Sequence, residues 1–178
     1  MWFLLAISAM ISTEWTVFKS NEGRFSILTP GNIIQDVKSF ETDIGSIDYY
    51  TFYHAVHPGV EEQPDKQENN TVFSVSYCEY PEYTVHSDST DMLLEFFSAT
   101  IQQSIPEGGK LVYASPEQID GFPGRLWRTS YGEAKVVKSK SFLVNNRFYL
   151  IQVFSNNKRA NRRDGDKFLD SFRLLGDN

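Results

Sequence analysis

Two histidines three residues apart are the side chains of this sequence best suited to bind a metal ion. His54 and His57 are followed by an acidic stretch that includes Glu61 and Glu62. Imidazole nitrogens and carboxylate oxygens are common zinc ligands, so a loop at this point could fold around an ion. The spacing matches no defined metal motif, because the segment reads as the end of a strand that enters a loop. We therefore expect no cofactor. A small metal-binding protein or enzyme that uses His54, His57 and Glu61 is the alternative.

A cluster of cations lies near the end of the chain. It consists of Lys158, Arg159, Arg162 and Arg163. Together with the free amides at the start of an expected helix, such side chains could hold a phosphate or a carboxylate. Charged runs between elements are also common as solvated loops. The cluster is a candidate binding site, and a solvated loop is the competing interpretation.

An aromatic and acidic segment follows one of the expected strands. Tyr80 and Tyr83 alternate there with Glu79, Pro81 and Glu82. Tyrosine rings bury a large area at a low entropy cost, so exposed rings of this kind favour protein recognition. The competing interpretation is that one or both rings pack over the start of the following helix. Tyr80 and Tyr83 are therefore candidate binding residues.

The pattern of nucleophiles does not favour an enzyme. The single cysteine, Cys78, lies in a strand-like run and is expected to be a buried structural thiol. The sequence has no Gly-x-Ser-x-Gly elbow, and Gly108-Gly109-Lys110 lacks the spacing of a phosphate-binding loop. We expect a domain without catalytic activity.

Composition limits the class of partner. The chain has 178 residues, 15% of them aromatic, and a net charge of −6. One domain with a ring-filled core is expected, and an acidic protein is a poor general ligand for nucleic acid or anionic lipid. We expect the partner to be another protein or an envelope component.

The first twelve residues are apolar and differ from the rest of the chain. Residues 1–12 are too short to span a bilayer, but they fit the hydrophobic region of a secretory signal. We expect residues 13–178 to form a single domain that is exported to the periplasm or the extracellular space. If residues 1–12 are part of the fold, a cytoplasmic location is the alternative.

We expect the remaining elements to be arranged around a hairpin that spans Glu133 to Ser155. Its second strand, 148–154, is apolar on both pleat faces, which predicts a place in the middle of a sheet. A type I′ turn is expected at Asn145-Asn146. Eight or nine strands joined by hairpins, with helices at about 90–105 and 164–171, predict an α+β domain: an antiparallel sheet flanked by helices.

Several short motifs together resemble the PsbP-like family. They are Trp15-x-x-Phe18-x-Ser20-x-Glu22-Gly23-Arg24-Phe25-Ser26 with Pro30-Gly31, the Gly-x-Pro-Gly-Arg segment 121–125, and Phe168-Leu169-x-Ser171-Phe172. The resemblance spans about 15–175 and implies an αβα sandwich, a fold shared by a photosystem II extrinsic subunit, a Ran-binding nuclear-import factor and exported bacterial proteins. It implies a non-catalytic scaffold that binds a partner. No manganese-cluster or Ran-binding residue of the family can be carried over to this chain.

Overall fold

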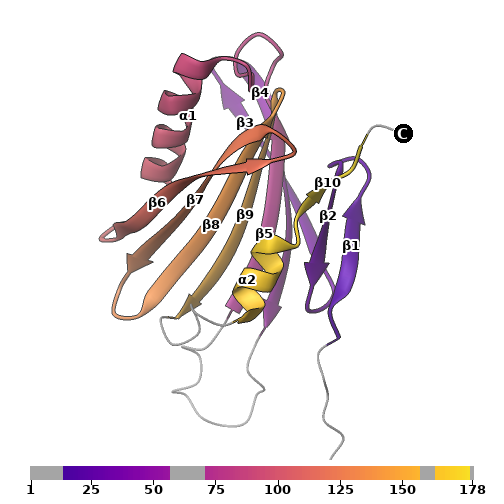
Figure 1. The fold of residues 1–178 in the computed structure, drawn as a ribbon, viewed down its shortest axis with the longest axis vertical. Helices are drawn as coiled ribbons and strands as arrows, with labels where there is room; N and C mark the ends of the chain where they lie inside the picture. Colours follow the sequence, from indigo (N-terminus) through magenta and orange to yellow (C-terminus); the bar gives the residue numbers. More distant parts are fainter. Residues whose placement is uncertain (1–13, 57–70, 157–162, 177–178) are drawn as a thin grey trace, which may run out of the picture.

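Most of the chain lies in two antiparallel sheets (Figure 1). The computed structural model describes residues 14–56, 71–156 and 163–176. The large sheet has seven strands in the order β3-β4-β5-β9-β8-β7-β6, and the small sheet has three in the order β1-β2-β10. The large-sheet strands are β3 (Ile34–Thr42), β4 (Gly45–Val56), β5 (Thr71–Glu79), β6 (Lys110–Ile119), β7 (Phe122–Tyr131), β8 (Lys135–Val144) and β9 (Arg147–Asn156). The small-sheet strands are β1 (Thr16–Ser20), β2 (Phe25–Thr29) and β10 (Arg173–Leu174).

Two helices cover opposite faces of the large sheet. They are α1 (Thr90–Gln103) and α2 (Arg163–Asp170). Because neighbouring residues of a strand point to opposite faces, Tyr77 and Cys78 of β5 define the two sides. Tyr77 belongs to the core that includes Phe168 of α2, whereas Cys78 belongs to the core that includes Phe97 of α1. Neither helix of the described residues is long and apolar enough to cross a membrane.

The small sheet packs on the α2 side through aromatic rings. Phe25 of β2 is fully buried. Its ring centroid lies 5.6–6.4 Å from the centroids of five other rings, with Phe172 at 5.6 Å and Phe52 at 5.7 Å. Such ring pairs add to the free energy of area burial. The two sheets are therefore joined by aromatic packing.

The expected central strand is confirmed. β9 has three strands on each side of it in the large sheet. Its residues Tyr149 and Ile151 are buried on the α2 side, and Phe148 is buried on the α1 side. Both faces need apolar residues because each is covered by another layer.

The type I′ assignment made from the sequence was wrong for the β8–β9 turn, and the structure shows positive φ at both turn positions of another hairpin. Asn145 has a φ of +54°, but Asn146 does not adopt a positive φ, so the β8–β9 turn is not type I′. The β6–β7 turn has positive φ at both Asp120 and Gly121, as type I′ requires. β7 accordingly begins at Phe122, directly after this turn.

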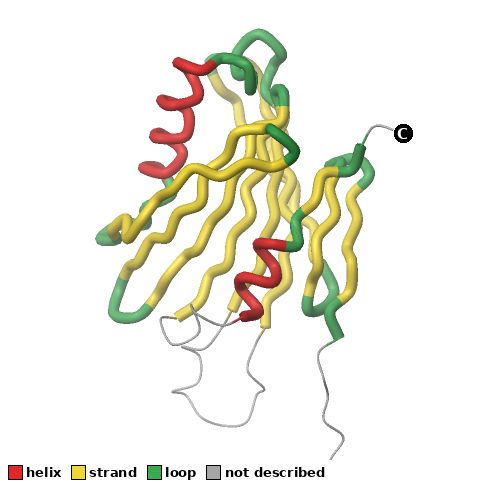
Figure 2. The backbone as a smooth tube through the Cα atoms, viewed as in Figure 1, coloured by secondary structure: helices red, strands yellow, loops and turns green. Residues whose placement is uncertain are grey.

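The α+β class and the antiparallel sheet are confirmed, with one correction. A helix-flanked sheet was expected, but the small sheet shares the α2 face with α2, so strands dominate the architecture (Figure 2). The described residues contain ten strands rather than eight or nine. Among these strands are the short strands β2 and β10, which lie near the two ends of the domain and pair with each other.

The expected signal segment, residues 1–12, lies outside the described residues.

Candidate functional site

A small polar pocket lies where several strand ends meet on the α2 side of the large sheet. Its volume is about 240 Å³. It is lined by Glu22, Ser46, Asp48, Tyr50, Tyr77, Glu79 and Arg147. These residues come from the β1–β2 turn and from β4, β5 and β9. A pocket of this size suits a single side chain or a small ionic group, because drug-sized ligands occupy larger cavities, roughly 300–1,000 Å³.

Strand register places the two tyrosines of the pocket side by side. Tyr50 of β4 pairs directly with Tyr77 of β5. Their ring centroids are 4.7 Å apart and the ring planes differ by 9°. Residues in such cross-strand pairs project from the same face, and aromatic pairs are among the stabilising ones. The stack forms an aromatic wall of the pocket.

Arg147 is held in place by several contacts. It pairs across β5 and β9 with Glu79, and its Nε donates to Glu79 Oε1 at 2.8 Å. Its Nη1 donates to the backbone carbonyl of Glu22 at 2.9 Å, and its guanidinium carbon lies 5.3 Å from the centroid of the Tyr77 ring. These bonds use the guanidinium group to join three segments of the chain, as the planar geometry of arginine allows. Arg147 therefore has a structural role in the pocket.

The pocket carries an excess of negative charge. Three carboxylates, those of Glu22, Asp48 and Glu79, line it against the single guanidinium of Arg147. Burial raises the pKa of the Tyr77 hydroxyl to about 12, and the nearby carboxylate of Glu22 acts in the same direction. The hydroxyl therefore stays protonated at neutral pH and can donate or accept a hydrogen bond.

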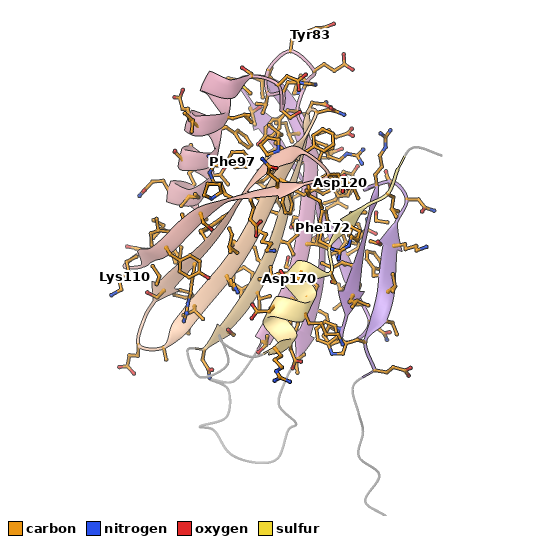
Figure 3. All side chains as sticks on the ribbon, viewed as in Figure 1. Tyr83, Phe97, Lys110, Asp120, Asp170 and Phe172 are labelled. Atoms are coloured by element: carbon orange, nitrogen blue, oxygen red, sulfur yellow. The ribbon has the colours of Figure 1, made fainter. Side chains whose placement is uncertain are left out.

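The two candidate tyrosines of the loop between β5 and α1 have different environments. The ring of Tyr80 packs edge-on against Phe96 of α1, with centroids 5.7 Å apart. Tyr83 is 98% exposed and points away from both sheets (Figure 3). One ring therefore packs over the helix start, and the other is free to contact a partner.

The loop that carries Tyr83 is tied to the β8–β9 turn. The Tyr80 amide donates to the carbonyl of Asn146 at 2.9 Å, and Asn146 Nδ2 donates to the carbonyl of Tyr80 at 2.6 Å. The Ser87 amide donates to the carbonyl of Asn145 at 2.9 Å. The asparagines therefore anchor both ends of the loop.

The basic cluster can be described only at its last residue. Arg163 is the first residue of α2 and is exposed. Lys158, Arg159 and Arg162 lie outside the described residues. Whether the four cations form one site stays a prediction.

The metal-site alternative can also be followed only in part. His54 Nδ1 is 2.8 Å from the carbonyl oxygen of Asn32, which fits a donated hydrogen bond and fixes the ring. His57 and Glu61 lie outside the described residues. Within the described ranges, no three His, Cys, Asp or Glu side chains are grouped so that they could hold a metal ion.

Cys78 is buried, as the sequence predicts. The thiol is 3% exposed, and burial raises its pKa to about 11. The thiolate is the reactive form of cysteine, so Cys78 is suited to packing rather than to nucleophilic attack at neutral pH.

The pocket residues were not found from the sequence. Tyr50 and Tyr77 lie in separate strands, and only the register of β4 and β5 brings them together. Arg147 makes a structural ion pair with Glu79. The guanidinium group of Arg125 donates to the Gly124 carbonyl and lies 5.0 Å from the Phe97 ring centroid.

The arrangement described above is an antiparallel two-sheet domain with a helix on each face of the large sheet. No protein-family model matches the sequence, and no curated protein matches it. The solution structure of cyanobacterial PsbP (CyanoP) from Synechocystis sp. PCC 6803 is similar, with a TM-score of 0.54, 15% identity, and coverage of 96% of this chain and 98% of that one. A protein of unknown function from Pseudomonas aeruginosa aligns with a TM-score of 0.34 and 8% identity, over 81% of this chain and 84% of its own. The chain has a PsbP-like fold.

Proposed function

We propose that this domain is a non-catalytic accessory module that binds another protein or an envelope component. The observation that carries the proposal is Tyr83, a large ring that is 98% exposed on a loop anchored by Asn145 and Asn146. Because hydrogen bonds already anchor both ends of the loop, binding through Tyr83 fixes mainly the two side-chain torsions of the ring, which limits the loss of conformational entropy. The similarity to CyanoP supports an accessory role through the shared fold.

The chemistry of the described side chains agrees with a binding role. The Cys78 thiol is buried and protonated at neutral pH. Arg147, the cation of the pocket, is held by Glu79 and by the Glu22 carbonyl. A catalytic group must reach the reacting atoms, and these groups are committed to packing or to the fold.

A crosslinking experiment tests the binding proposal. A photoreactive amino acid is placed at position 83 and, as the control, at Leu94, which is 60% exposed on α1. A partner crosslinked from position 83 is then purified, and its Kd is measured with the wild-type domain, Tyr83→Ala and Leu94→Ala. We expect Tyr83→Ala to raise Kd by about tenfold or more, as for an exposed aromatic anchor, and Leu94→Ala to leave it unchanged. Equal Kd values for the wild type and Tyr83→Ala would refute the proposal.

Export is the second part of the proposal. The apolar residues 1–12 support it, because their length and composition fit the hydrophobic region of a secretory signal. Cell fractionation followed by mass measurement of the recovered protein tests this part. A protein that lacks the first residues and is found outside the cytoplasm is the expected result. A full-length cytoplasmic protein would show that residues 1–12 are not an export signal.

A further inference from the structure

We propose that the pocket between β4, β5 and the β1–β2 turn receives the guanidinium group of an arginine side chain from the partner protein. The inference rests on the proposed binding function, and it names the chemistry that the partner must present. The proposal is built on four features of the pocket: its size, its charge, its aromatic wall and an unused hydroxyl.

Size and charge together select a small cationic group. The volume of about 240 Å³ is below that of a drug-sized ligand site. Three carboxylates against one guanidinium leave an excess of two negative charges among the lining residues. Since Arg147 is already bonded to Glu79 and to the Glu22 carbonyl, it does not offer an anion site. A cation is therefore the ligand that the electrostatics favour.

Tyr77 supplies a polar group that the fold does not use. The residue is only 3% exposed and lines the pocket. Its hydroxyl makes no hydrogen bond to another residue of the described chain, although the carboxylates of Glu22 and Glu79 are near enough to raise its pKa. The hydroxyl can therefore exchange hydrogen bonds with a group that enters the pocket. The stacked rings of Tyr50 and Tyr77 add aromatic surface that attracts cations.

The spacing of the carboxylates favours an organic cation over a metal ion. A metal ion needs its oxygen ligands at about 2.0–2.6 Å from one point. The acidic residues here do not form such a group, since no three His, Cys, Asp or Glu of the described ranges could hold a metal. A guanidinium group is planar and has five N–H donors directed outward, so it can bond to carboxylates that are too far apart to share an ion.

Free oxygen atoms are available for these donors. Glu79 accepts from Arg147 through Oε1, which leaves Oε2. Asp48 accepts from the Ser39 hydroxyl through Oδ1 at 2.6 Å, which leaves Oδ2. The side chains of Asp48, Glu79 and Glu22 are all solvent-exposed in part, so a partner's side chain can reach them.

A peptide titration followed by NMR tests the inference directly. The probe is a short capped peptide with one arginine, and the control peptide has citrulline, its uncharged isostere, at the same position. The labelled full chain is titrated with each peptide, and the amide signals of Ser46, Asp48, Tyr50 and Tyr77 are monitored. We expect saturable shifts at these residues with the arginine peptide and none with the citrulline peptide. Equal binding of the two peptides would overturn the inference.

Matched variants separate the pocket from the overall negative charge. Glu22→Gln and Asp48→Asn each remove one pocket charge at an exposed position. Asp36→Asn removes one charge from β3, and the strand register places it on the opposite face from Tyr50. We expect each pocket variant to weaken the arginine peptide about three- to tenfold, as for a hydrogen-bonded charge pair, and Asp36→Asn to have little effect. Equal weakening by all three variants, or a lysine peptide that binds as tightly as the arginine peptide, would refute guanidinium recognition in this pocket.

Kd measurements with the partner that is crosslinked from position 83 test this inference separately from the proposed function. If that partner binds the Glu22→Gln/Asp48→Asn double variant with the wild-type Kd, the arginine pocket is refuted and the binding function stands. If Tyr83→Ala leaves the Kd unchanged, the proposed role of Tyr83 is refuted, and the peptide titration still decides whether the pocket binds arginine.

Discussion

The hydroxyl of Tyr149 gives the sharpest test of how β9 holds the small sheet. It donates to the backbone carbonyl of Gly23 at 2.8 Å, and the residue is 1% exposed. This bond joins the central strand of the large sheet to the β1–β2 turn. Tyr149→Phe keeps the ring and removes the donor, so the buried Gly23 carbonyl loses its partner. An orphaned buried acceptor costs about 1–3 kcal/mol, which is the expected loss in the free energy of unfolding.

Urea denaturation followed by fluorescence measures this loss. With a slope near 2 kcal/mol/M, the midpoint should fall by about 0.5–1.5 M. Tyr113→Phe is the matched control, because Tyr113 is 38% exposed on the edge strand β6. The control should change the free energy of unfolding by less than about 0.5 kcal/mol.

A loss below about 0.5 kcal/mol for Tyr149→Phe, no larger than the control, would refute the reasoning. It would mean that the Gly23 carbonyl finds water or another donor once the phenol is gone. A change in the slope would show that the variant alters the compactness of the folded or the unfolded state rather than one hydrogen bond.

Three further predictions follow from buried residues of the large sheet. Ile151→Asp places an unpaired charge at a site with 0% exposure, so circular dichroism should detect no folded protein. A soluble, folded variant would show that β9 is not central. The pKa of Tyr77 is raised from 10.0 to about 12, so its contribution to stability is complete below pH 10 and is lost as the pH rises toward 12. Phenolate absorbance should show a late-titrating tyrosine that Tyr77→Phe removes, and an unchanged titration curve would contradict this assignment. Cys78, with a pKa raised to about 11, should react with a thiol reagent at pH 8 only after urea unfolds the protein, and fast labelling of the native protein would contradict its burial.

Local patterns were sufficient for the central strand and the helices. Residues 148–154 are apolar at successive positions, and such a run is stable only with both faces covered, which β9 confirms. The three- and four-residue spacing around Phe97 predicted α1, and Phe97 is 1% exposed. Both results depend on short-range periodicity, which a single sequence carries.

Pairing between distant segments could not be predicted. Arg173 pairs with Ser26, and nothing near either residue specifies the other. The small sheet was therefore missed as a separate layer. The β8–β9 turn was assigned wrongly because asparagine tolerates positive φ at either turn position, and in the structure only Asn145 of the two adopts it.

The residues of the candidate sites also differ in whether a local sequence pattern could identify them. Tyr83 was identified because its loop combines aromatic and acidic residues, a local signal. The Tyr50–Tyr77 pocket depends on the register of two strands and on the Arg147–Glu79 bond, so it became visible only in three dimensions.

The pairing of β2 with β10 also determines when the domain can complete its fold during synthesis. Phe25 lies against Phe172, with ring centroids 5.6 Å apart, and the Leu28 amide donates to the Ser171 hydroxyl. A ribosome-bound chain that ends before these residues lacks the ring that covers Phe25 and the strand that completes the small sheet. Contacts between residues this far apart can form only after nearly the whole domain has been synthesised, and such non-local contacts slow folding. The nascent chain therefore keeps an open aromatic core until α2 and β10 emerge, and chaperones that bind exposed rings have that interval in which to act.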